Sequence, residues 1–451
     1  MKSTLILPVL FFVFQLETLS AQTGSIAQVP ASAIDEVFSE FDNPETPGCA
    51  IGVNHEGSLI FSKGYGAANL DYGIPLRPDS RFMIASISKQ FAAAALLMLE
   101  QEGKLNLDQD LRPAIQEISQ FKEPITARQL ILHTSGIRDI FNLLSIADIG
   151  LDNTTTNEQA LEMLANQNAL NFMPGTRHLY SNMAYFLMSV VVERFSGYTL
   201  REYTDKHFFK PIGMDATHWH DDTGMIVPDR VISYLPTANG PGMFYRGNID
   251  RVGDRGLFTT IEDFAKWDNN FVENRSNLDN FMEKMVKPGS IASADSINYA
   301  SGMRLGRYKT LYTVGHGGNY MGFRSNYVRF PDHDLGIFVF CNMSNINPAS
   351  YTYDTADLYL APVFSDLFEE YIGEYRNEGF NTRYEIDVKE GDLYINIPFR
   401  EPRKLNWSAD DSFTSDEWQV HFNRNSEDVV NGFTVETTRT GKLTFIKKSN
   451  H

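Results

Sequence analysis

The sequence predicts an α/β or α+β fold followed by a small all-β unit, a sandwich or a barrel. Strand-like apolar segments lie within residues 49–63 and return within 310–341, whereas the residues between them, 126–280, are largely helical in pattern. Beyond Gly373, short segments alternate apolar and charged residues with no helical period. We therefore expect one sheet built from both ends of a first unit, with helices inserted between its strands.

The first elements are a β-hairpin and a helix. Residues 49–63 predict the hairpin, because two apolar segments flank a glycine-containing turn at 55–57. From Ile87 the apolar residues recur at helical spacing as far as Gly103, which is typical of a helix C-terminus. Ser86 is therefore expected at the N-terminus of this helix, where the helix dipole favours developing negative charge.

The remaining helices and strands are predicted from the same helical and strand periodicities. Start signals and apolar spacing predict helices at 129–132, 182–196, 262–270 and 356–371. Alternating or continuous apolar runs predict strands at 310–314, 322–330 and 336–341, with a turn at 332–334. The chain is thus divided into a first unit over residues 29–365 and an all-β unit over residues 371–451.

The N-terminus has the pattern of a secretory signal peptide over residues 1–21. Lys2 precedes an apolar run from Leu5 to Leu16 that is too short to span a bilayer, and small residues lead up to a cleavage site near Ala21. No second long apolar stretch follows. We therefore expect an exported protein, periplasmic or secreted, with no membrane span.

Charge and motif content exclude several function classes. A formal net charge of −18 at pH 7 excludes nucleic acid as a partner, because its phosphates would be repelled. The sequence contains no phosphate loop, no dinucleotide fingerprint and no G-x-S-x-G turn, so no cofactor is expected. His218 and His220 could share one face of a strand, but no third clustered ligand accompanies them, and we predict no metal site.

Two cysteines, Cys49 and Cys341, are present. Each lies in an apolar, strand-like segment, which favours two buried thiols. Export would permit a single disulfide between them, and the sequence leaves that alternative open.

The segment Ser86-Ile87-Ser88-Lys89 places a hydroxyl and an amine one helical turn apart. Positions i and i+3 share a helix face, so the side chains of Ser86 and Lys89 can meet. A serine hydroxyl is a weak nucleophile until a neighbouring group takes its proton, and a desolvated lysine can do so. Alone, the pattern favours an N-cap serine followed by a solvated lysine, so other motifs must decide.

Two further motifs supply possible partners for Ser86 and Lys89. Tyr180-Ser181-Asn182 opens an apolar helix; a tyrosinate at Tyr180 could act as a base if nearby ammonium groups lower its pKa, and Asn182 could orient the lysine and a substrate amide. Late in the chain, His316-Gly317-Gly318-Asn319 lies on a strand where glycines let a substrate backbone come close. His133 is predicted to be a structural hydrogen-bonding residue, and Ser88 to cap or pack at the helix start.

In this order, the three motifs resemble those of the serine β-lactamase and penicillin-binding protein superfamily. Within this superfamily they resemble the class C β-lactamases and the related D-peptidases and esterases. Supporting similarity lies at 130–137, 211–214 and 256–263, and the resemblance covers residues 29–365. It implies an antiparallel sheet flanked by helices, with a helical subdomain. The tail over 371–451 resembles the lipocalin-like β-domains that often follow such hydrolase domains.

The resemblance implies roles for the motif residues. Ser86 is acylated, Lys89 and Tyr180 move protons, and Asn182 positions the substrate. The backbone N–H groups of Ser86 and Asn319 hold the oxyanion, and Gly317 and Gly318 lie beside the substrate. His316 takes the place of a lysine found in many β-lactamases, and a histidine is cationic only part of the time near pH 7.

The expected function is an exported serine hydrolase that cleaves an amide or ester bond, in D-amino-acid peptides or related compounds, through an acyl-enzyme on Ser86. Its partner is a small-molecule or peptide substrate, with cell-wall peptides among the candidates. Two alternatives remain: a class C-like β-lactamase, and a catalytically weak protein that binds cell-wall peptides. The β-lactamase alternative differs mainly in how fast water hydrolyses the acyl-enzyme. Loss of Ser86, Lys89 or Tyr180 would have favoured the binding protein, and all three residues are present.

Overall fold

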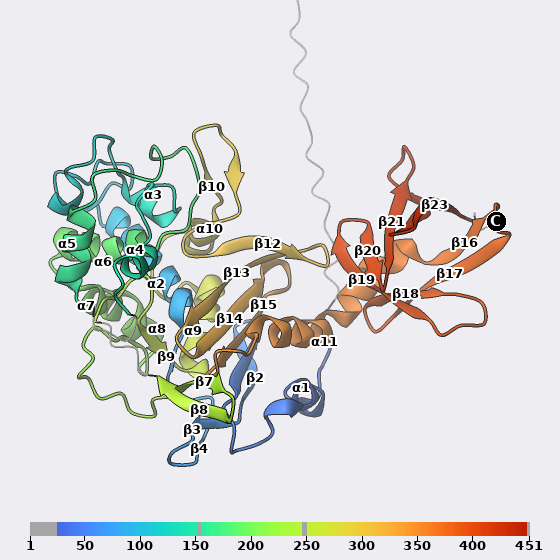
Figure 1. Ribbon diagram of the computed structural model, residues 1–451, viewed down its shortest axis with the longest axis horizontal. Coiled ribbons are helices and arrows are strands. Elements are labelled where there is room, and N and C mark those ends of the chain that lie inside the picture. Colours follow the sequence, from blue (N-terminus) through green and yellow to red (C-terminus); the bar gives the residue numbers. More distant parts are fainter. Residues whose placement is uncertain (1–24, 151–154, 246–249, 449–451) are drawn as a thin grey trace, which may run out of the picture.

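A computed structural model of the protein describes residues 25–150, 155–245 and 250–448 (Figure 1). The predicted signal peptide lies outside these residues and stays a prediction. Within the described part, no helix is long and apolar enough to cross a membrane.

The centre of the first unit is a six-stranded antiparallel sheet with the strand order β12-β13-β14-β15-β1-β2. Its strands are β1 (Cys49–His55), β2 (Ser58–Tyr65), β12 (Arg304–Tyr308), β13 (Leu311–Tyr320), β14 (Phe323–Phe330) and β15 (Leu335–Cys341). The predicted hairpin is β1–β2, and β15 pairs with β1. The expectation of one sheet made from both ends of this unit is therefore confirmed.

Strands β1 and β15 read as continuous apolar runs because both faces of the sheet are covered. Phe338 and Phe340 of β15 pack on one side, against the core that contains helix α9 (Ile261–Glu273). Ile337 and Val339 face the opposite core, beneath helix α11 (Pro348–Phe368). The period-2 alternation thus divides one strand between two hydrophobic cores.

Cys49 and Cys341 lie opposite each other in the β1–β15 register and are joined by a disulfide. Both are fully buried, as expected, but the preferred interpretation as two separate thiols is wrong. A separation of 292 residues gives no local signal, and only the pairing of the first strand with the last brings the two residues together.

Helices form the second layer and a helical subdomain beside the sheet (Figure 1). Besides α9 they are α2 (Lys89–Gln101), α3 (Ala127–Ile131), α4 (Ile140–Ile146), α5 (Asn157–Ala165), α6 (Asn182–Ser196), α7 (Leu200–Thr204), α8 (Lys210–Ile212) and α10 (Phe281–Val286). A single turn of 3₁₀ helix, Ala85–Ser88, precedes α2, and α1 (Ala31–Val37) packs against α11.

Short strands complete the first unit. A three-stranded sheet has the order β5 (Phe82–Met83), β9 (Leu257–Thr259), β6 (His218–Trp219). Three two-stranded pairs are β3 (Ala67–Asn69) with β4 (Ile74–Pro75), β7 (Ser233–Thr237) with β8 (Gly240–Tyr245), and β10 (Gly289–Ser290) with β11 (Ser296–Ile297).

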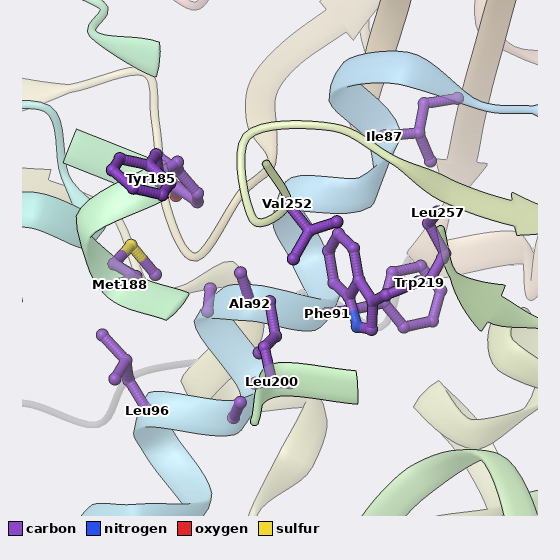
Figure 2. Close-up of a cluster of buried hydrophobic side chains, with 14 of the residues drawn as sticks. Ile87, Phe91, Ala92, Leu96, Tyr185, Met188, Leu200, Trp219, Val252 and Leu257 are labelled. Atoms are coloured by element: carbon purple, nitrogen blue, oxygen red, sulfur yellow. The ribbon is translucent and has the colours of Figure 1, made fainter. Parts of the chain in front are cut away.

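Helix α2 is buried on all sides from Lys89 to Leu99, which explains why its sequence is alanine-rich and apolar from Phe91 to Leu99. Figure 2 shows its side chains Phe91 and Leu96 in one cluster with Tyr185 and Met188 of α6 and with Trp219. Helix α2, which directly follows the turn that carries the candidate nucleophile, is therefore held by packing on every side.

Helix α11 begins at Pro348 and ends at Phe368, followed by a 3₁₀ turn at Glu369–Tyr371. The prediction placed this helix at 356–371 and so missed its first two turns. Asn347 caps its N-terminus and Pro348 occupies the first helical position, a start signal hidden by the polar and aromatic residues that follow.

The tail is a closed eight-stranded barrel, which decides between the predicted sandwich and barrel. Its strands are β16 (Gly373–Asn377), β17 (Thr382–Lys389), β18 (Asp392–Asn396), β19 (Arg403–Ala409), β20 (Ser412–Ser415), β21 (Trp418–Arg424), β22 (Val430–Thr437) and β23 (Thr440–Lys447). Aromatic and aliphatic side chains fill its interior, and the ring of Tyr371, in the turn that follows α11, packs at a tilted angle against Phe422 with ring centroids 4.5 Å apart. Figure 1 shows α11 running from the sheet to the barrel.

Candidate active site

The predicted nucleophile, Ser86, lies in the 3₁₀ turn directly before α2. Its Oγ is 3.1 Å from Lys89 Nζ and 3.0 Å from the phenolic oxygen of Tyr180. The preceding residue, Ala85, has a φ of +50°, a conformation that L-residues rarely adopt and that is common at functional turns. The structure therefore brings both Lys89 and Tyr180 within hydrogen-bond distance of Ser86 Oγ.

Lys89 is fully buried, although it is the charged residue of the motif. Its Nζ lies 2.9 Å from Asn182 Oδ1 and 2.6 Å from the backbone carbonyl oxygen of Asp254. Burial lowers the pKa of Lys89 to about 7. In the neutral amine, two N–H groups donate to these two acceptors, so the lone pair is left for the Ser86 hydroxyl.

Tyr180 was predicted to carry a lowered pKa and to act as a tyrosinate, and the structure contradicts this. Burial raises its pKa above the ordinary value of 10.0, and this outweighs the opposite effect of the hydrogen bond with Ser86. The phenol is therefore protonated at neutral pH and donates to Ser86 Oγ. Of the two candidate bases, Lys89 is the one that can be neutral near pH 7.

Asn182 is fixed by a residue that the sequence did not point to, Asp139. One carboxylate oxygen of Asp139 caps helix α4, and the other accepts both the backbone N–H and the side-chain Nδ2 of Asn182, at 2.7 Å and 2.8 Å. The amide oxygen of Asn182 is thereby turned toward Lys89. An N-cap aspartate before an apolar helix was the only signal for Asp139.

His316 is buried, and its Nδ1 lies 2.6 Å from the carbonyl oxygen of Gly317. A carbonyl oxygen only accepts, so Nδ1 carries the proton and Nε2, which is 3.4 Å from the Tyr299 hydroxyl, keeps its lone pair. Burial lowers the pKa of His316 to about 3. The expectation that this imidazole is cationic part of the time near pH 7 is therefore wrong; it is neutral.

Gly317, Gly318 and Asn319 lie on β13 where the strand borders the cleft. A Cβ on Gly318 would come within 2.4 Å of the backbone carbonyl oxygen of Ile84, so glycine is needed for β13 to approach the turn that carries Ser86. Strand β12 pairs with β13 only as far as Gly315. The segment 317–319 therefore has no β12 partner, and a peptide-like substrate can pair there.

The predicted site residues other than Lys89 line one cleft with a volume of about 770 Å³, large enough for a dipeptide-sized ligand. Its lining includes Ser86, Tyr180, Asn182, His316, Gly317, Gly318 and Asn319. Lys89 lies behind this surface, in contact with Ser86. Among the described residues, no group of three or more His, Cys, Asp or Glu side chains could hold a metal ion, and His218 and His220 have no third ligand.

Comparison with known proteins decides the family. The family model described as Beta-lactamase matches residues 34–360. The chain belongs to this β-lactamase family. It is 26% identical over 298 residues to a D-aminopeptidase of Gluconobacter oxydans, covering 66% of this chain and 56% of the relative, and 28% identical to a D-aminopeptidase of Cereibacter sphaeroides, covering 66% and 57%. The chain thus spans little more than half the length of these relatives.

Solved structures share the fold of this β-lactamase-family protein. The octameric penicillin-binding protein homologue from Pyrococcus abyssi aligns with a TM-score of 0.64 and 21% identity, over 92% of this chain and 98% of its own. A D-amino acid amidase from Ochrobactrum anthropi SV3, complexed with L-phenylalanine, aligns with a TM-score of 0.57 and 20% identity, over 74% and 98%. The antiparallel sheet with flanking helices is therefore confirmed as the fold of the family.

The protein also has a buried charged cluster that sequence reasoning missed. Asp254, whose carbonyl oxygen contacts Lys89, pairs through its carboxylate with Arg255 and lies 3.6 Å from Arg251. Arg255 in turn lies over the Phe141 ring at 4.4 Å. Gly253, with a φ of +113°, marks the turn, but no motif revealed the cluster itself.

His133 and Ser88 occupy the structural roles expected of them. Nδ1 of His133 accepts the backbone N–H of Ser181, the residue that caps α6. Ser88 Oγ accepts the backbone N–H of Leu257 in β9. His133 therefore fixes the start of α6, and Ser88 fixes the turn that carries the nucleophile to β9.

Proposed function

We propose that this β-lactamase-family protein is an exported serine hydrolase that forms an acyl-enzyme on Ser86. Its substrates are amides or esters, in D-amino-acid peptides or related compounds. The observation that carries the proposal is that Ser86 Oγ contacts both a buried lysine and a protonated tyrosine at the wall of the cleft. The D-stereochemistry is supported by the names of the relatives, D-aminopeptidases and a D-amino acid amidase.

In the acylation step, neutral Lys89 takes the hydroxyl proton of Ser86 while Oγ forms a bond to the substrate carbonyl carbon. The carbonyl oxygen becomes an oxyanion, held by the backbone N–H groups of Ser86 and Asn319. When the bond to the leaving group breaks, Tyr180 gives its phenolic proton to the departing atom. The Lys89 ammonium then returns a proton to Tyr180, so both groups recover their starting states.

In deacylation, Lys89 acts first as the base and then as the acid. A water molecule gives its proton to neutral Lys89 and attacks the ester carbonyl, and the oxyanion is stabilised as before. Collapse of the intermediate breaks the bond to Ser86 Oγ, which regains a proton from Lys89. The product acid leaves, and the resting enzyme is restored.

A stereochemical pair tests the substrate class. For matched D- and L-alanine p-nitroanilides, we expect kcat/KM to favour the D-isomer by about tenfold or more, because the cleft must fit one side-chain direction when the carbonyl lies between Ser86 and β13. Initial rates measure this, and intact-mass detection identifies the adduct on the protein. Equal rates, or a preference for the L-isomer, would contradict the D-specific assignment. Rapid multiple turnover of nitrocefin would instead favour the β-lactamase alternative.

A pH profile tests the identity of the base. Only neutral Lys89 can accept the Ser86 proton, so kcat/KM for a neutral ester should rise with pH and level off above a midpoint near 7. Burial holds the pKa of His316 to about 3 and that of Tyr180 above 10.0, so neither accounts for such a midpoint. Rates measured between about pH 5 and about pH 9 give the profile. A profile that does not change over this range would exclude Lys89 as the titrating base.

A further inference from the structure

Three buried charged side chains, Arg251, Asp254 and Arg255, lie in the loop that leads to β9, next to the lysine that the proposed mechanism uses as its base. Each of them is at most 3% exposed. The backbone carbonyl oxygen of Asp254 accepts a hydrogen bond from Lys89 Nζ at 2.6 Å. The residue that contacts the amine through its backbone therefore also carries a carboxylate whose charge can act on that amine.

The Asp254 carboxylate is bound by the two arginines rather than by Lys89. Its Oδ2 accepts from Arg255 Nη1 at 2.5 Å, and its Oδ1 lies 3.6 Å from Arg251 Nε. Burial raises the pKa of this carboxyl, but the charges of Arg255 and Arg251 outweigh burial and hold the pKa below its ordinary value, so the group is ionised. In the described part of the chain, Lys89 Nζ hydrogen-bonds only uncharged oxygens, those of Ser86, Asn182 and the Asp254 backbone.

Aromatic rings fix both guanidinium groups in place. Arg255 lies between Phe141 and Tyr320, at 4.4 Å and 4.6 Å from the two ring centroids. Arg251 lies 5.5 Å from the centroid of Phe141 and 5.7 Å from that of Phe186. Cation–π contacts of this kind keep both arginines beside the carboxylate.

The loop that carries the cluster is itself tightly packed. Gly253 has a φ of +113°, and a Cβ there would come within 2.5 Å of the backbone carbonyl oxygen of Tyr185 in α6. Figure 2 shows Val252 beside Trp219 in the hydrophobic core. The backbone of this loop is therefore held independently of the charged side chains, and the carbonyl oxygen of Asp254 should keep its place when those side chains are replaced.

Two buried arginines around one carboxylate destabilise the fold. Within the described residues, Nε and both Nη atoms of Arg251 have no hydrogen-bond partner, and neither have Nε and Nη2 of Arg255. Buried donors without acceptors are costly, and a single arginine is enough to neutralise a single carboxylate. Stability therefore does not explain the second arginine, and its place behind Lys89 points to an effect on the active site.

Burial is the main reason that the pKa of Lys89 is lowered to about 7, and the strongest charge effects on the amine balance one another. Asp254 and Asp139 favour the ammonium form, whereas Arg255 and Arg251 oppose it. The other titratable side chains around the amine are uncharged at neutral pH, because burial lowers the pKa of the histidines and raises that of the tyrosines: His133, His316, Tyr180 and Tyr185. Removal of one arginine would leave an excess of negative charge beside the base.

We propose that Arg251 and Arg255 are positioning residues that keep the Asp254 carboxylate away from Lys89 and cancel its charge, so that the buried amine stays an uncharged base. Without Arg255, the carboxylate loses its hydrogen-bonded partner, and Lys89, which contacts the backbone of the same residue, becomes available as a counterion. An ion pair between them fixes a proton on the amine and removes the base. This inference rests on the proposed function, because it takes Lys89 as the group that accepts the Ser86 proton.

The pH dependence of kcat/KM for a neutral p-nitrophenyl ester, measured from about pH 5 to about pH 10, tests the proposal. Arg255→Gln should move the midpoint upward by about one pH unit or more, because one negative charge beside the amine is no longer cancelled. Asp254→Asn keeps the backbone carbonyl oxygen and should move the midpoint downward, because two arginines then face a single carboxylate. An unchanged midpoint in Arg255→Gln overturns the proposal; if that variant does not fold, an unchanged midpoint in Asp254→Asn does so.

A double variant that combines Asp254→Asn with Arg255→Gln separates an electrostatic role from a structural one. It leaves one arginine and one carboxylate beside the amine, so its midpoint should return to within about half a pH unit of the wild type. Arg255→Lys retains the charge and should also keep the midpoint near that of the wild type, even where the lost stacking lowers the rate. A double variant that keeps the upward shift, or an Arg255→Lys shift equal to that of Arg255→Gln, contradicts the proposal.

Arg329→Gln provides the matched control. Arg329 is buried on β14, pairs with Asp268 at 2.7 Å, and is not among the residues that line the cleft. Its replacement takes the same charge from another buried pair, so we expect a lower melting temperature and an unchanged midpoint. An equal upward shift in Arg329→Gln would assign the effect to overall charge and overturn the role of Arg251 and Arg255.

The wild type distinguishes failure of this inference from failure of the proposed function. If the wild type does not hydrolyse the ester, or if Ser86→Ala hydrolyses it equally well, the proposed function fails. If the wild type shows a midpoint near 7 that Arg255→Gln does not move, only the role of the arginines is contradicted.

Discussion

Replacement of Ser86 by alanine should reduce hydrolysis of every substrate to the background rate, a loss on the order of 10⁴-fold or more. The reason is that the covalent intermediate forms on Ser86 Oγ, and neither Lys89 nor Tyr180 can replace it as the attacking atom. Initial rates with an activated ester, which requires the least assistance, give the most demanding measurement. Intact-mass analysis should show an acyl adduct on the wild type and none on Ser86→Ala.

The fold should survive this substitution. Ser86 is partly exposed at the wall of the cleft, and the helix behind it is held by the buried side chains from Lys89 to Leu99. Ser58→Ala, which removes the same hydroxyl from an exposed position on β2, serves as the control and should retain full activity. Circular dichroism checks that both variants are folded. Undiminished hydrolysis by folded Ser86→Ala would remove Ser86 from the mechanism.

Elements with strong local signals were predicted closely. Helix α6 begins and ends where the sequence placed it, because Ser181 caps its start and Gly197, with a φ of +78°, ends it. Strand β14 was also found within one residue of its start, since its apolar residues are bounded by turns. In these segments the local preference and the tertiary structure agree, so the pattern alone was sufficient.

Features that depend on distant partners were not predictable. The disulfide between Cys49 and Cys341 follows from the pairing of the first and last strands of one unit. The tail became a barrel because β16 pairs with β23, a closure that no single strand encodes. Both are properties of topology rather than of any local stretch.

In the candidate site, too, locally determined features were predicted and features that depend on distant segments were not. The spacing of Ser86 and Lys89 correctly placed a hydroxyl beside an amine, because helix geometry is local. The direction of the Tyr180 pKa was predicted wrongly, because it depends on burial by surrounding segments. Two groups were missed: Asp139, which orients Asn182, and the carbonyl oxygen of Asp254, which accepts from Lys89. A backbone acceptor, or a residue that contacts only another site residue, has no sequence motif that would reveal it.

Replacement of Lys89 by methionine should lower kcat/KM by a factor of order 10² or more, because the other side chain hydrogen-bonded to Ser86 Oγ in the described part of the chain is the protonated Tyr180. The methionine side chain fits a site that is already fully buried, so the loss reports the amine rather than a change in volume. Steady-state rates and the rate of adduct formation measure the effect. Activity within tenfold of the wild type would exclude Lys89 as the base.

The same variant should change the pH dependence of stability in a defined direction. Burial lowers the pKa of Lys89 from 10.5 to about 7, so between these values the unfolded chain binds more protons than the folded chain. The free energy of unfolding of the wild type should therefore rise, relative to that of Lys89→Met, as the pH increases through this range. Denaturant unfolding near both limits measures the difference, with Lys104→Met, an exposed lysine just beyond α2, as the control. A constant difference between wild type and Lys89→Met would mean that the amine is charged in the folded protein, and the acylation step would then need another base.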